Sequence, residues 1–473
     1  MSTAPPSLHV HPDRLLPPEP HLRPIARRLY DAVRHLPIIS PHGHVDADVL
    51  AQDLPFHDPA TLLVSPDHYV TRLLHAQGVP LSELGVGAGR LDEAQARRAW
   101  RHLCTHWSAF RGTPVHYWLQ CQLHDMFGVT LRPSAATADE IYDVIDLRLR
   151  EDAFRPRALY RQFGIEVLAT TDDPVADLGA HAALRADPQW SGRVIPTFRP
   201  DRHLEPALPG WDRAVKQLGE AAGIDTGDYA GYLAALEARR AHFIEQGATS
   251  ADHSHLDVRA EPLEAREAAR IYAASLGGTA SPAEAVAFRR HMLMEMARMS
   301  VEDGLVMTLH PAVRRNHHPP TSARFGGDTG HDIPVRAEFT RALQPLLERY
   351  GTHPGFRLVL FTTDEAVYSR ELAPLAGFYP SVFVGAPWWF LDAPDAIQRV
   401  RSAVTETAGF RRTSGFIDDT RAFCSIPVRH DMSRRLDSGW LARLVADHRL
   451  EEDEALETIT ELVTVTPRQA FRL

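Results

Sequence analysis

Short hydrophobic runs, many of them rich in β-branched residues, recur along the chain, and each ends in polar or charged residues. One run lies at residues 37–39, and seven more follow residue 160, at 167–171, 194–198, 248–251, 305–309, 358–361, 382–385 and 415–417. Stretches with apolar residues at helical spacing separate the runs. This alternation predicts eight buried strands that are connected by helices.

Eight buried strands that alternate with helices are typical of a (β/α)₈ barrel of the α/β class, whose active site lies at the carboxyl ends of the strands. The chemically interesting residues fall at these ends in most of the eight cases. The alternative is a doubly wound open sheet, which favours a glycine-rich phosphate turn after the first strand. The sequence has no such turn there, so we expect the barrel.

The pattern also predicts how the chain is divided. Residues 1–46 form an N-terminal arm, a helix and the first strand, and residues 47–160 form a large helical insertion without convincing strands. Residues 161–430 supply the rest of the barrel, and residues 431–473 form a helical tail that packs on it. The long polar segment at 316–332 is predicted to be a loop that lines or covers the site.

Two histidines, His42 and His44, follow the first strand in a His-Gly-His sequence. Alternate residues of an extended chain point to the same side, and neutral imidazole is a common ligand of zinc and similar ions. The pair therefore predicts part of a metal site. Two other pairs with this spacing are interpreted as chance: His9 with His11, and His253 with His255.

A carboxylate follows the last predicted strand, at Asp419. The first and eighth strands are neighbours once a barrel closes, so His42, His44 and Asp419 are predicted to bind one divalent ion and to leave positions open for substrate. His310, after the fifth strand, is either a further ligand or a substrate contact. The sixth strand ends without a histidine, which argues against a two-ion site.

Arginines follow three of the strands, at Arg199, Arg315 and Arg421. Guanidinium groups bind carboxylate or phosphate in a bidentate way, so these residues indicate an anionic substrate. No glycine-rich loop is present to hold a phosphate, which favours a carboxylate. Trp388 and Trp389 follow the seventh strand and either stack on a sugar or pack against the insertion.

Composition excludes several classes of protein. The chain has 473 residues and a formal net charge of −10, and no basic stripe is paired with aromatics, so we expect no nucleic-acid partner. No run of about 18 apolar residues is present to span a membrane. Three scattered cysteines and an N-terminus unlike a signal peptide indicate the cytoplasm. The sequence leaves open whether the protein forms a homo-oligomer.

Several motifs occur in an order that is more specific than the histidine pair. They are Leu-Pro-Ile-Ile at 36–39 before the His-Gly-His, Asp-His-Tyr at 67–69, Thr-Thr-Asp-Asp-Pro at 170–174, Phe-Arg-Pro-Asp at 198–201, Leu-His at 309–310 with Arg-Asn at 315–316, Trp-Trp-Phe at 388–390 and Asp-Thr-Arg-Ala-Phe at 419–423. In these motifs the chain resembles the uronate isomerase (glucuronate isomerase) family of the amidohydrolase superfamily over nearly its whole length. The resemblance implies a distorted barrel and one divalent ion of the Zn²⁺ type. It also implies a small uronate sugar as substrate, with interconversion of D-glucuronate with D-fructuronate and of D-galacturonate with D-tagaturonate.

The resemblance also implies roles for residues of this sequence. His42, His44 and Asp419 match its metal ligands. A further set matches residues that hold or process the substrate: His68, Tyr69, Arg199, His310 and Arg421. Without the resemblance, residues 67–69 would be assigned to a surface turn. Ser40-Pro41, Pro311 and Thr420 depart from the family pattern and leave the preferred uronate open.

The predicted chemistry is a proton transfer from C2 to C1 of an open-chain sugar through an enediolate. Asp419 is the candidate base, and Arg421, Arg199 or Tyr69 would stabilise the negative charge. His310 is placed with these catalytic residues, and the predicted substrate contacts are His68, Arg315, Trp388 and Trp389. The alternatives are a metal-dependent hydrolase or decarboxylase on the same barrel and a non-catalytic carbohydrate-binding barrel.

Overall fold

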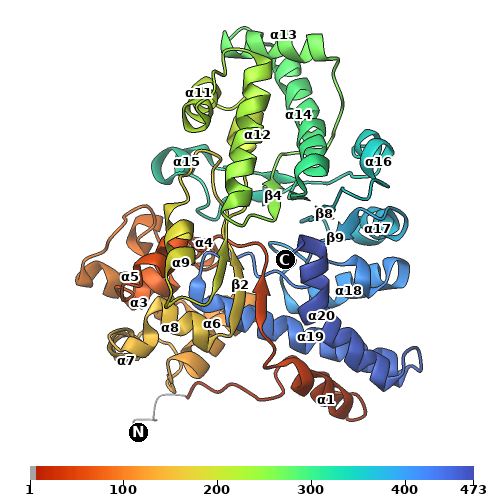
Figure 1. Cartoon of the computed structure of the whole chain (residues 1–473). Coiled ribbons are helices and arrows are strands. Elements are labelled where there is room, and N and C mark those ends of the chain that lie inside the picture. Colours follow the sequence, from red (N-terminus) through yellow and green to blue (C-terminus); the bar gives the residue numbers. More distant parts are fainter. Residues whose placement is uncertain (1–6) are drawn as a thin grey trace.

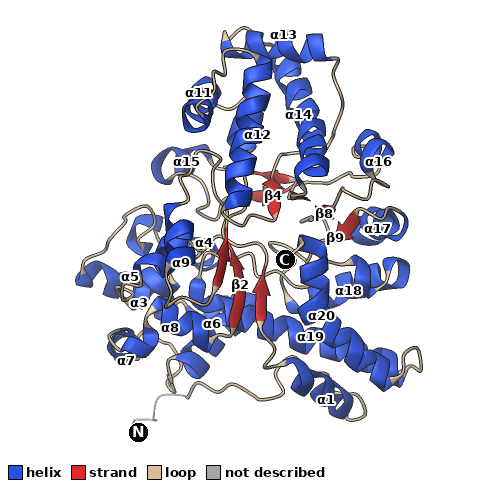
Figure 2. Cartoon of the chain, in the orientation of Figure 1, coloured by secondary structure: helices blue, strands red, loops and turns tan. Residues whose placement is uncertain are grey.

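Seven short parallel strands form two ladders at the centre of the molecule (Figure 2). The computed structural model describes residues 7–473; the first six residues of the predicted arm lie outside the described residues. The first ladder consists of β1 (Ile38–Ser40), β2 (Ile165–Ala169) and β3 (Arg193–Ile195). The second consists of β4 (Ser250–His253), β5 (Val306–Leu309), β8 (Leu358–Leu360) and β9 (Val382–Val384). All seven lie where the hydrophobic runs predict strands.

Isolated contacts join the two ladders into a distorted barrel. The backbone N–H of Asp252 donates to the carbonyl of Phe198 at 2.8 Å, which connects the end of the first ladder with β4. On the other side, the N–H of Ser414 donates to the carbonyl of Val384 at 2.8 Å, and that of His44 donates to the carbonyl of Thr420 at 3.0 Å. Residues 413–420 thus take the place of an eighth strand.

This eighth segment is not the regular strand that was predicted at 415–417. Gly415 has a φ of 72° and Asp419 a φ of 41°. Both are in the left-handed region, which turns the backbone away from the extended form that a ladder needs. The irregular segment instead aims the Asp419 side chain into the barrel mouth.

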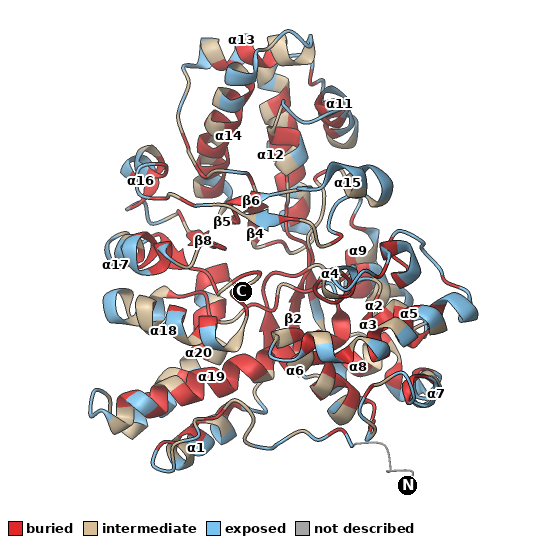
Figure 3. Cartoon of the chain, turned by 180° about the vertical axis from the view of Figure 1, so that it is seen from behind, coloured by how far each residue is buried: buried red, intermediate tan, exposed pale blue. Residues whose placement is uncertain are grey.

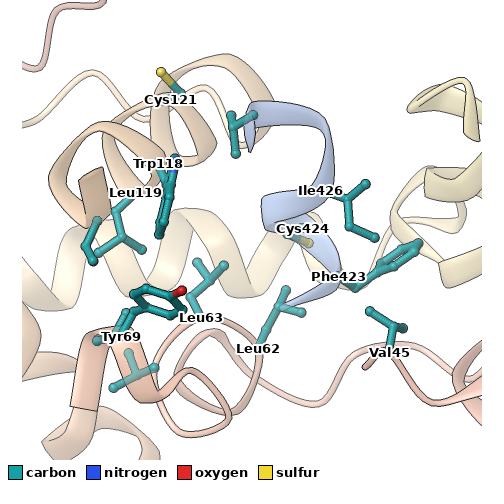
Figure 4. Packing of buried hydrophobic residues seen from close by; sticks show 14 of the residues in the cluster. Val45, Leu62, Leu63, Tyr69, Trp118, Leu119, Cys121, Phe423, Cys424 and Ile426 are labelled. Carbon is teal, nitrogen blue, oxygen red and sulfur yellow. The ribbon is translucent and has the colours of Figure 1, made fainter. Parts of the chain in front are cut away.

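Helices fill the long connection between β1 and β2. They are α2 (Ala47–Gln52), α3 (Pro59–Leu63), α4 (His68–His75), α5 (Glu93–Thr105), α6 (Pro114–Cys121), α7 (Ala138–Leu149) and α8 (Pro156–Gln162). Figure 4 shows Leu62, Leu63 and Trp118 of this region packed with Phe423 and Ile426 from the end of the barrel. The insertion and the barrel therefore share one hydrophobic core, and the division of the chain at residues 46, 160 and 430 remains a prediction.

Four helices project together from one end of the molecule (Figure 1). They are α11 (Trp211–Ala222), α12 (Tyr229–Glu245), α13 (Ala265–Leu276) and α14 (Pro282–Asp303), and the short α10 (Asp201–Leu204) leads into them. A capping box between Ser281 and Glu284 starts α14. Buried Trp211, Tyr232 and Phe288 form the aromatic interior of this unit.

The remaining helices of the barrel cover its outer face. They are α9 (Gly179–Ala186), α16 (Gln344–Tyr350), α17 (Ala373–Phe378) and α18 (Pro394–Ala408). The segment after β5 holds more structure than the predicted loop. It contains α15 (Pro319–Phe325) between two short antiparallel strands, β6 (Val313–Arg314) and β7 (Ile333–Pro334).

The two ends of the chain pack together. The helix α1 (Arg23–Val33) contacts both helices of the tail, α19 (Ile426–Ala446) and α20 (Glu452–Phe471). Figure 3 shows that α19 is buried along most of its length, and the buried residues include polar ones, Arg429 and Arg434 among them. Among residues 7–473, no helix has both the length and the apolar character needed to cross a membrane.

Candidate active site

A cavity of about 750 Å³ opens at the carboxyl ends of the strands. All the side chains that were predicted to form the site line it: His42, His44, His68, Tyr69, Arg199, His310, Arg315, Trp388, Trp389, Asp419 and Arg421. Acidic residues outside the prediction also line it: Asp201, Glu205, Asp328 and Asp332. The structure thus brings the predicted residues together, while their individual roles remain predictions.

Two neighbouring segments hold the His-Gly-His turn in place. The Thr171 hydroxyl, just after β2, donates to the carbonyl of Gly43 at 2.8 Å. The N–H of His44 bonds to the eighth segment as described above. The two histidines therefore project from a turn that is hydrogen-bonded to a neighbouring segment on each side.

Two histidines and an aspartate form a possible metal site. One ligand atom from each of His42, His310 and Asp419 lies within 4.8 Å of the others, in a search of the described residues. The Nε2 atoms of His42 and His44 lie 3.5 and 3.1 Å from Oδ1 of Asp419. His310, which the sequence left as either a further ligand or a substrate contact, lies in this cluster, and the predicted ligand His44 lies beside Asp419, so the ligand set His42, His44 and Asp419 remains a prediction.

The chemistry of these side chains suits a divalent cation. Burial lowers the pKa of His42 to about 4, so its imidazole is neutral and can donate a lone pair. Burial opposes ionisation of Asp419, but the hydrogen bond from His44, together with the electrostatic effect of the neighbouring histidines, outweighs it and holds the pKa of Asp419 well below its usual range. Within residues 7–473, the buried Nε2 of His310 has no hydrogen-bond partner. A carboxylate and two imidazoles, one with a free buried nitrogen, fit an ion of the zinc type.

A buried carboxylate that the sequence analysis missed orients His310. Asp252, at the end of β4, is completely buried, and its Oδ1 lies 2.5 Å from Nδ1 of His310. The Thr308 hydroxyl donates to the same oxygen at 2.6 Å. The His310 ring stacks between His42 and Phe361, with centroid distances of 4.7 and 4.0 Å. The signal for Asp252 was its place directly after the fourth hydrophobic run, the position that marked the other site residues.

Arg199 lies beside the same carboxylate. Its Nη1 is 3.5 Å from Oδ2 of Asp252, and its Nε donates to Asp201 at 2.9 Å. The guanidinium is therefore held by two acidic groups at the edge of the cavity. This leaves its remaining N–H groups for an anion or a developing negative charge.

The other two arginines meet at the segment after β6. Arg421 donates to Oδ2 of Asp328 at 2.7 Å, and Nη1 of Arg315 lies 3.6 Å from Oδ1 of the same residue. Arg315 also donates to buried Asp332 at 3.1 Å. The segment at 316–332 thus reaches the cavity, as predicted, and places a carboxylate between two arginines.

His68 and Tyr69 reach the site from the first turn of α4. Asp67 caps this helix by accepting a hydrogen bond from the N–H of Tyr69 at 2.9 Å. The Tyr69 hydroxyl donates to Oδ2 of Asp392 at 2.7 Å. Burial, followed by the charge of Asp392, raises the pKa of Tyr69 well above its usual value, so the residue keeps its proton. The expectation of a surface turn, based on local polarity, is wrong.

Aromatic rings form one wall of the cavity. Trp388 meets the edge of the His310 ring at a centroid distance of 4.8 Å, and Trp389 lies 5.2 Å from both His68 and the Arg315 guanidinium. Burial, and then the charge of Arg421, lower the pKa of His68 to about 3, so its ring is neutral. The tryptophans thus contact the residues of the site directly.

Comparison with known proteins decides the family. A model of the family described as glucuronate isomerase matches residues 22–470. The chain belongs to this family. It is 52% identical to the uronate isomerase of Cutibacterium acnes over 473 residues, which is 100% of both chains.

Solved structures of the family share the fold. The crystal structure of glucuronate isomerase from Caulobacter crescentus has a TM-score of 0.96 and 46% identity, over 98% of this chain and 97% of that one. The uronate isomerase from Thermotoga maritima has a TM-score of 0.91 and 27% identity, over 98% of this chain and 100% of that one. The predicted amidohydrolase-type barrel, the predicted family and the predicted aldose–ketose isomerase are confirmed, in preference to a hydrolase, a decarboxylase or a non-catalytic binding barrel.

Proposed function

We propose that the protein interconverts D-glucuronate with D-fructuronate and D-galacturonate with D-tagaturonate in the cavity at the barrel mouth. The observation that carries this proposal is the placement of a His–His–Asp cluster next to three arginines in one cavity. The cluster and Arg199 act on the carbonyl end of an open-chain sugar, and Arg315 and Arg421 bind its carboxylate end. The relatives named above carry the names of uronate and glucuronate isomerases.

Arginines at the open side of the cavity bind the substrate carboxylate. Arg421 is 37% exposed and Arg315 is 33% exposed, so both guanidinium groups are accessible from solvent. Asp328 contacts both of them, and the carboxylate of a uronate has the same charge and shape. A bidentate contact of this kind fixes the orientation of the sugar chain.

One divalent ion, of the zinc type, would be held by His42, His310 and Asp419, with His44 beside Asp419. Such an ion would supply Lewis-acid stabilisation of the negative charge that develops on the sugar. His310 presents its Nε2 to this position because its Nδ1 faces Asp252.

Asp419 is the base that transfers a proton from C2 to C1 of the substrate. Its carboxylate is ionised and takes the proton from C2, and the electrons of the broken C–H bond form the C1–C2 double bond of an enediolate. Return of the proton to C1, with transfer of the hydroxyl proton from the oxygen on C2 to the oxygen on C1, gives a ketone at C2 and a hydroxyl at C1, so no atom is gained or lost. Arg199 stabilises the enediolate with its free N–H groups, and Tyr69 accepts hydrogen bonds from substrate hydroxyls because its own proton is donated to Asp392.

The test is turnover by the purified, zinc-loaded protein. It is incubated with glucuronate and galacturonate, and the ketose products are measured by chromatography. The matched controls are glucose and galactose, which have the same stereochemistry without the carboxylate. Formation of fructuronate or tagaturonate, with little product from the neutral sugars, supports the proposal. Comparable turnover of uronates and neutral sugars, or of none of them, contradicts it.

A further inference from the structure

A buried arginine behind the cavity wall contacts two parts of the site. Arg429 lies in the first turn of α19 and is 1% exposed. Its guanidinium stacks over the ring of Trp118 at 3.6 Å. Taking a guanidinium out of water is unfavourable unless acceptors are placed around it. The groups that accept hydrogen bonds from Arg429 therefore indicate which parts of the site it supports.

One acceptor leads to Tyr69. Nη1 of Arg429 donates to Oδ2 of Asp392 at 2.9 Å, and the Tyr69 hydroxyl donates to the same oxygen. Asp392 is itself 5% exposed. The arginine thus neutralises and fixes the carboxylate that determines where the Tyr69 hydroxyl points.

The other acceptor leads to Asp419. The same Nη1 lies 3.2 Å from the carbonyl oxygen of Asp418, the residue before the candidate base. The next residue of α19, His430, bonds through Nε2 to the Asp418 carboxylate at 3.0 Å. Asp419 has a φ of 41°, a conformation that non-glycine residues adopt only where the surroundings hold it. Arg429 and His430 thus hold the backbone carbonyl and the side-chain carboxylate of Asp418, the residue directly before Asp419.

We propose that Arg429 is a positioning residue that sets Tyr69 and Asp419 relative to each other. It reaches Tyr69 through the Asp392 carboxylate and Asp419 through the Asp418 backbone, without touching the substrate. The inference deepens the proposed function, on which its turnover readout rests. Its second readout, metal affinity, is independent of turnover because Asp419 belongs to the metal cluster.

The test compares two buried arginines of the same helix. Arg429→Met removes both contacts, Arg429→Lys keeps the charge, and Arg429→Met with Asp392→Asn avoids leaving a buried carboxylate without its partner. The matched control is Arg434→Met, because Arg434 is 6% exposed and donates to the carbonyls of Arg34 and Pro37, away from the cavity. Circular dichroism selects the folded variants, kcat and KM are measured with glucuronate, and metal affinity is measured by competition with a chelator.

In the folded Arg429 variants we expect kcat to fall by about 100-fold with little change in KM, because the base and the hydroxyl are displaced while the arginine contacts to the carboxylate remain. Metal affinity should fall by about 10- to 100-fold. Arg434→Met should leave both quantities near the wild-type values, even if its melting temperature decreases. Wild-type kcat and metal affinity in a folded Arg429 variant, or equal losses in Arg434→Met, would overturn the proposal.

A double-mutant cycle provides a further check. Because Arg429 acts partly through Tyr69, the loss of kcat in Arg429→Lys combined with Tyr69→Phe should be smaller than the product of the single losses. The combination with Arg315→Met should be multiplicative. Multiplicative losses in both combinations count against the coupling to Tyr69. If the wild-type protein turns over no uronate, the proposed function fails, and metal affinity still decides the role of Arg429.

Discussion

Nδ1 of His310 lies 2.5 Å from Oδ1 of Asp252, a carboxylate with no exposed surface. The carboxylate accepts a hydrogen bond from Nδ1–H, so the lone pair of His310 is on Nε2, on the side of His42 and Asp419. Replacing Asp252 with Asn should weaken this preference, and we expect metal affinity to fall by about 10- to 100-fold. Chelator competition checks this, with Thr308→Val as the milder comparison. An unchanged affinity would show that His310 is not oriented by Asp252.

The metal cluster predicts the metal content of the protein. Elemental analysis of the purified protein should find about one divalent ion per chain. His42→Asn and His310→Asn should each lose most of it, because two of three ligands hold an ion weakly. His9→Ala is the control, since His9 is exposed and its imidazole hydrogen-bonds to the Ser7 hydroxyl. Full metal content in His310→Asn would indicate that His44, rather than His310, is the second histidine ligand.

The assignment of Asp419 as the base predicts the fate of the transferred proton. In heavy water, deuterium should appear at C1 of the ketose, at least in part, because a carboxylate proton can exchange before it is returned. Asp419→Asn should abolish turnover, since an amide cannot accept the proton. Mass spectrometry and proton NMR of the product give the answer. Complete transfer of label from C2 to C1, together with an active Asp419→Asn variant, would exclude this mechanism.

The position of Arg421 predicts how it affects specificity. Losing a charge-assisted contact with the substrate carboxylate costs about 2–5 kcal/mol, so Arg421→Met should lower kcat/KM for uronates by about tens- to thousandfold. The matched control is Arg411→Met, because the guanidinium of Arg411 pairs with Glu461 at 2.6 Å on the outer surface. Steady-state kinetics with both uronates make the comparison. A similar loss in the two variants would argue against a specific role for Arg421.

Two buried histidines predict a pH dependence of stability. Burial lowers the pKa of His181 and of His253 to about 4, from a usual value of 6.5. Between these values the unfolded chain binds more protons than the folded protein, so the stability is present above pH 6.5 and is lost as the pH falls towards 4. Each histidine should remove about 2 kcal/mol from the free energy of unfolding between pH 7.5 and pH 5. Urea unfolding of the metal-free protein measures this, and His253→Gln should reduce the slope whereas His9→Ala should not.

The sequence was most informative where the barrel geometry itself brings residues together. Strand ends converge in any (β/α)₈ barrel, so residues that follow most of the hydrophobic runs met in one cavity. The exclusion of His253 and His255 from the metal set stays a prediction; their Nδ1 atoms bond to the Thr308 carbonyl and to Glu205, each at 3.1 Å. The irregular eighth segment was not predicted, because a hydrophobic run gives no indication of a positive φ at Asp419.

Polar contacts between side chains that are distant in the sequence could not be predicted from the sequence. Arg429 lies on a helix that is buried on all sides and contains many polar residues, so its pattern has no apolar face that would reveal its orientation. Its link to Tyr69 joins residues from opposite ends of the chain through Asp392. Asp328 lies in an irregular segment, where no periodicity fixes the direction of a side chain. These residues emerge only once the tertiary fold is known.

The contact of α1 with α19 and α20, and the bond from His44 to Thr420, have a consequence for synthesis of the protein. The segment that flanks one edge of β1, residues 413–420, is available only after it has left the ribosome. The helices α19 and α20, which cover α1, are synthesised later still. Until then the nascent chain carries an open strand edge and two histidines without the carboxylate that completes their site. Loading of a metal at this cluster would therefore wait until Asp419 has been synthesised, and a polypeptide that ends before Asp419 lacks the carboxylate of the site altogether.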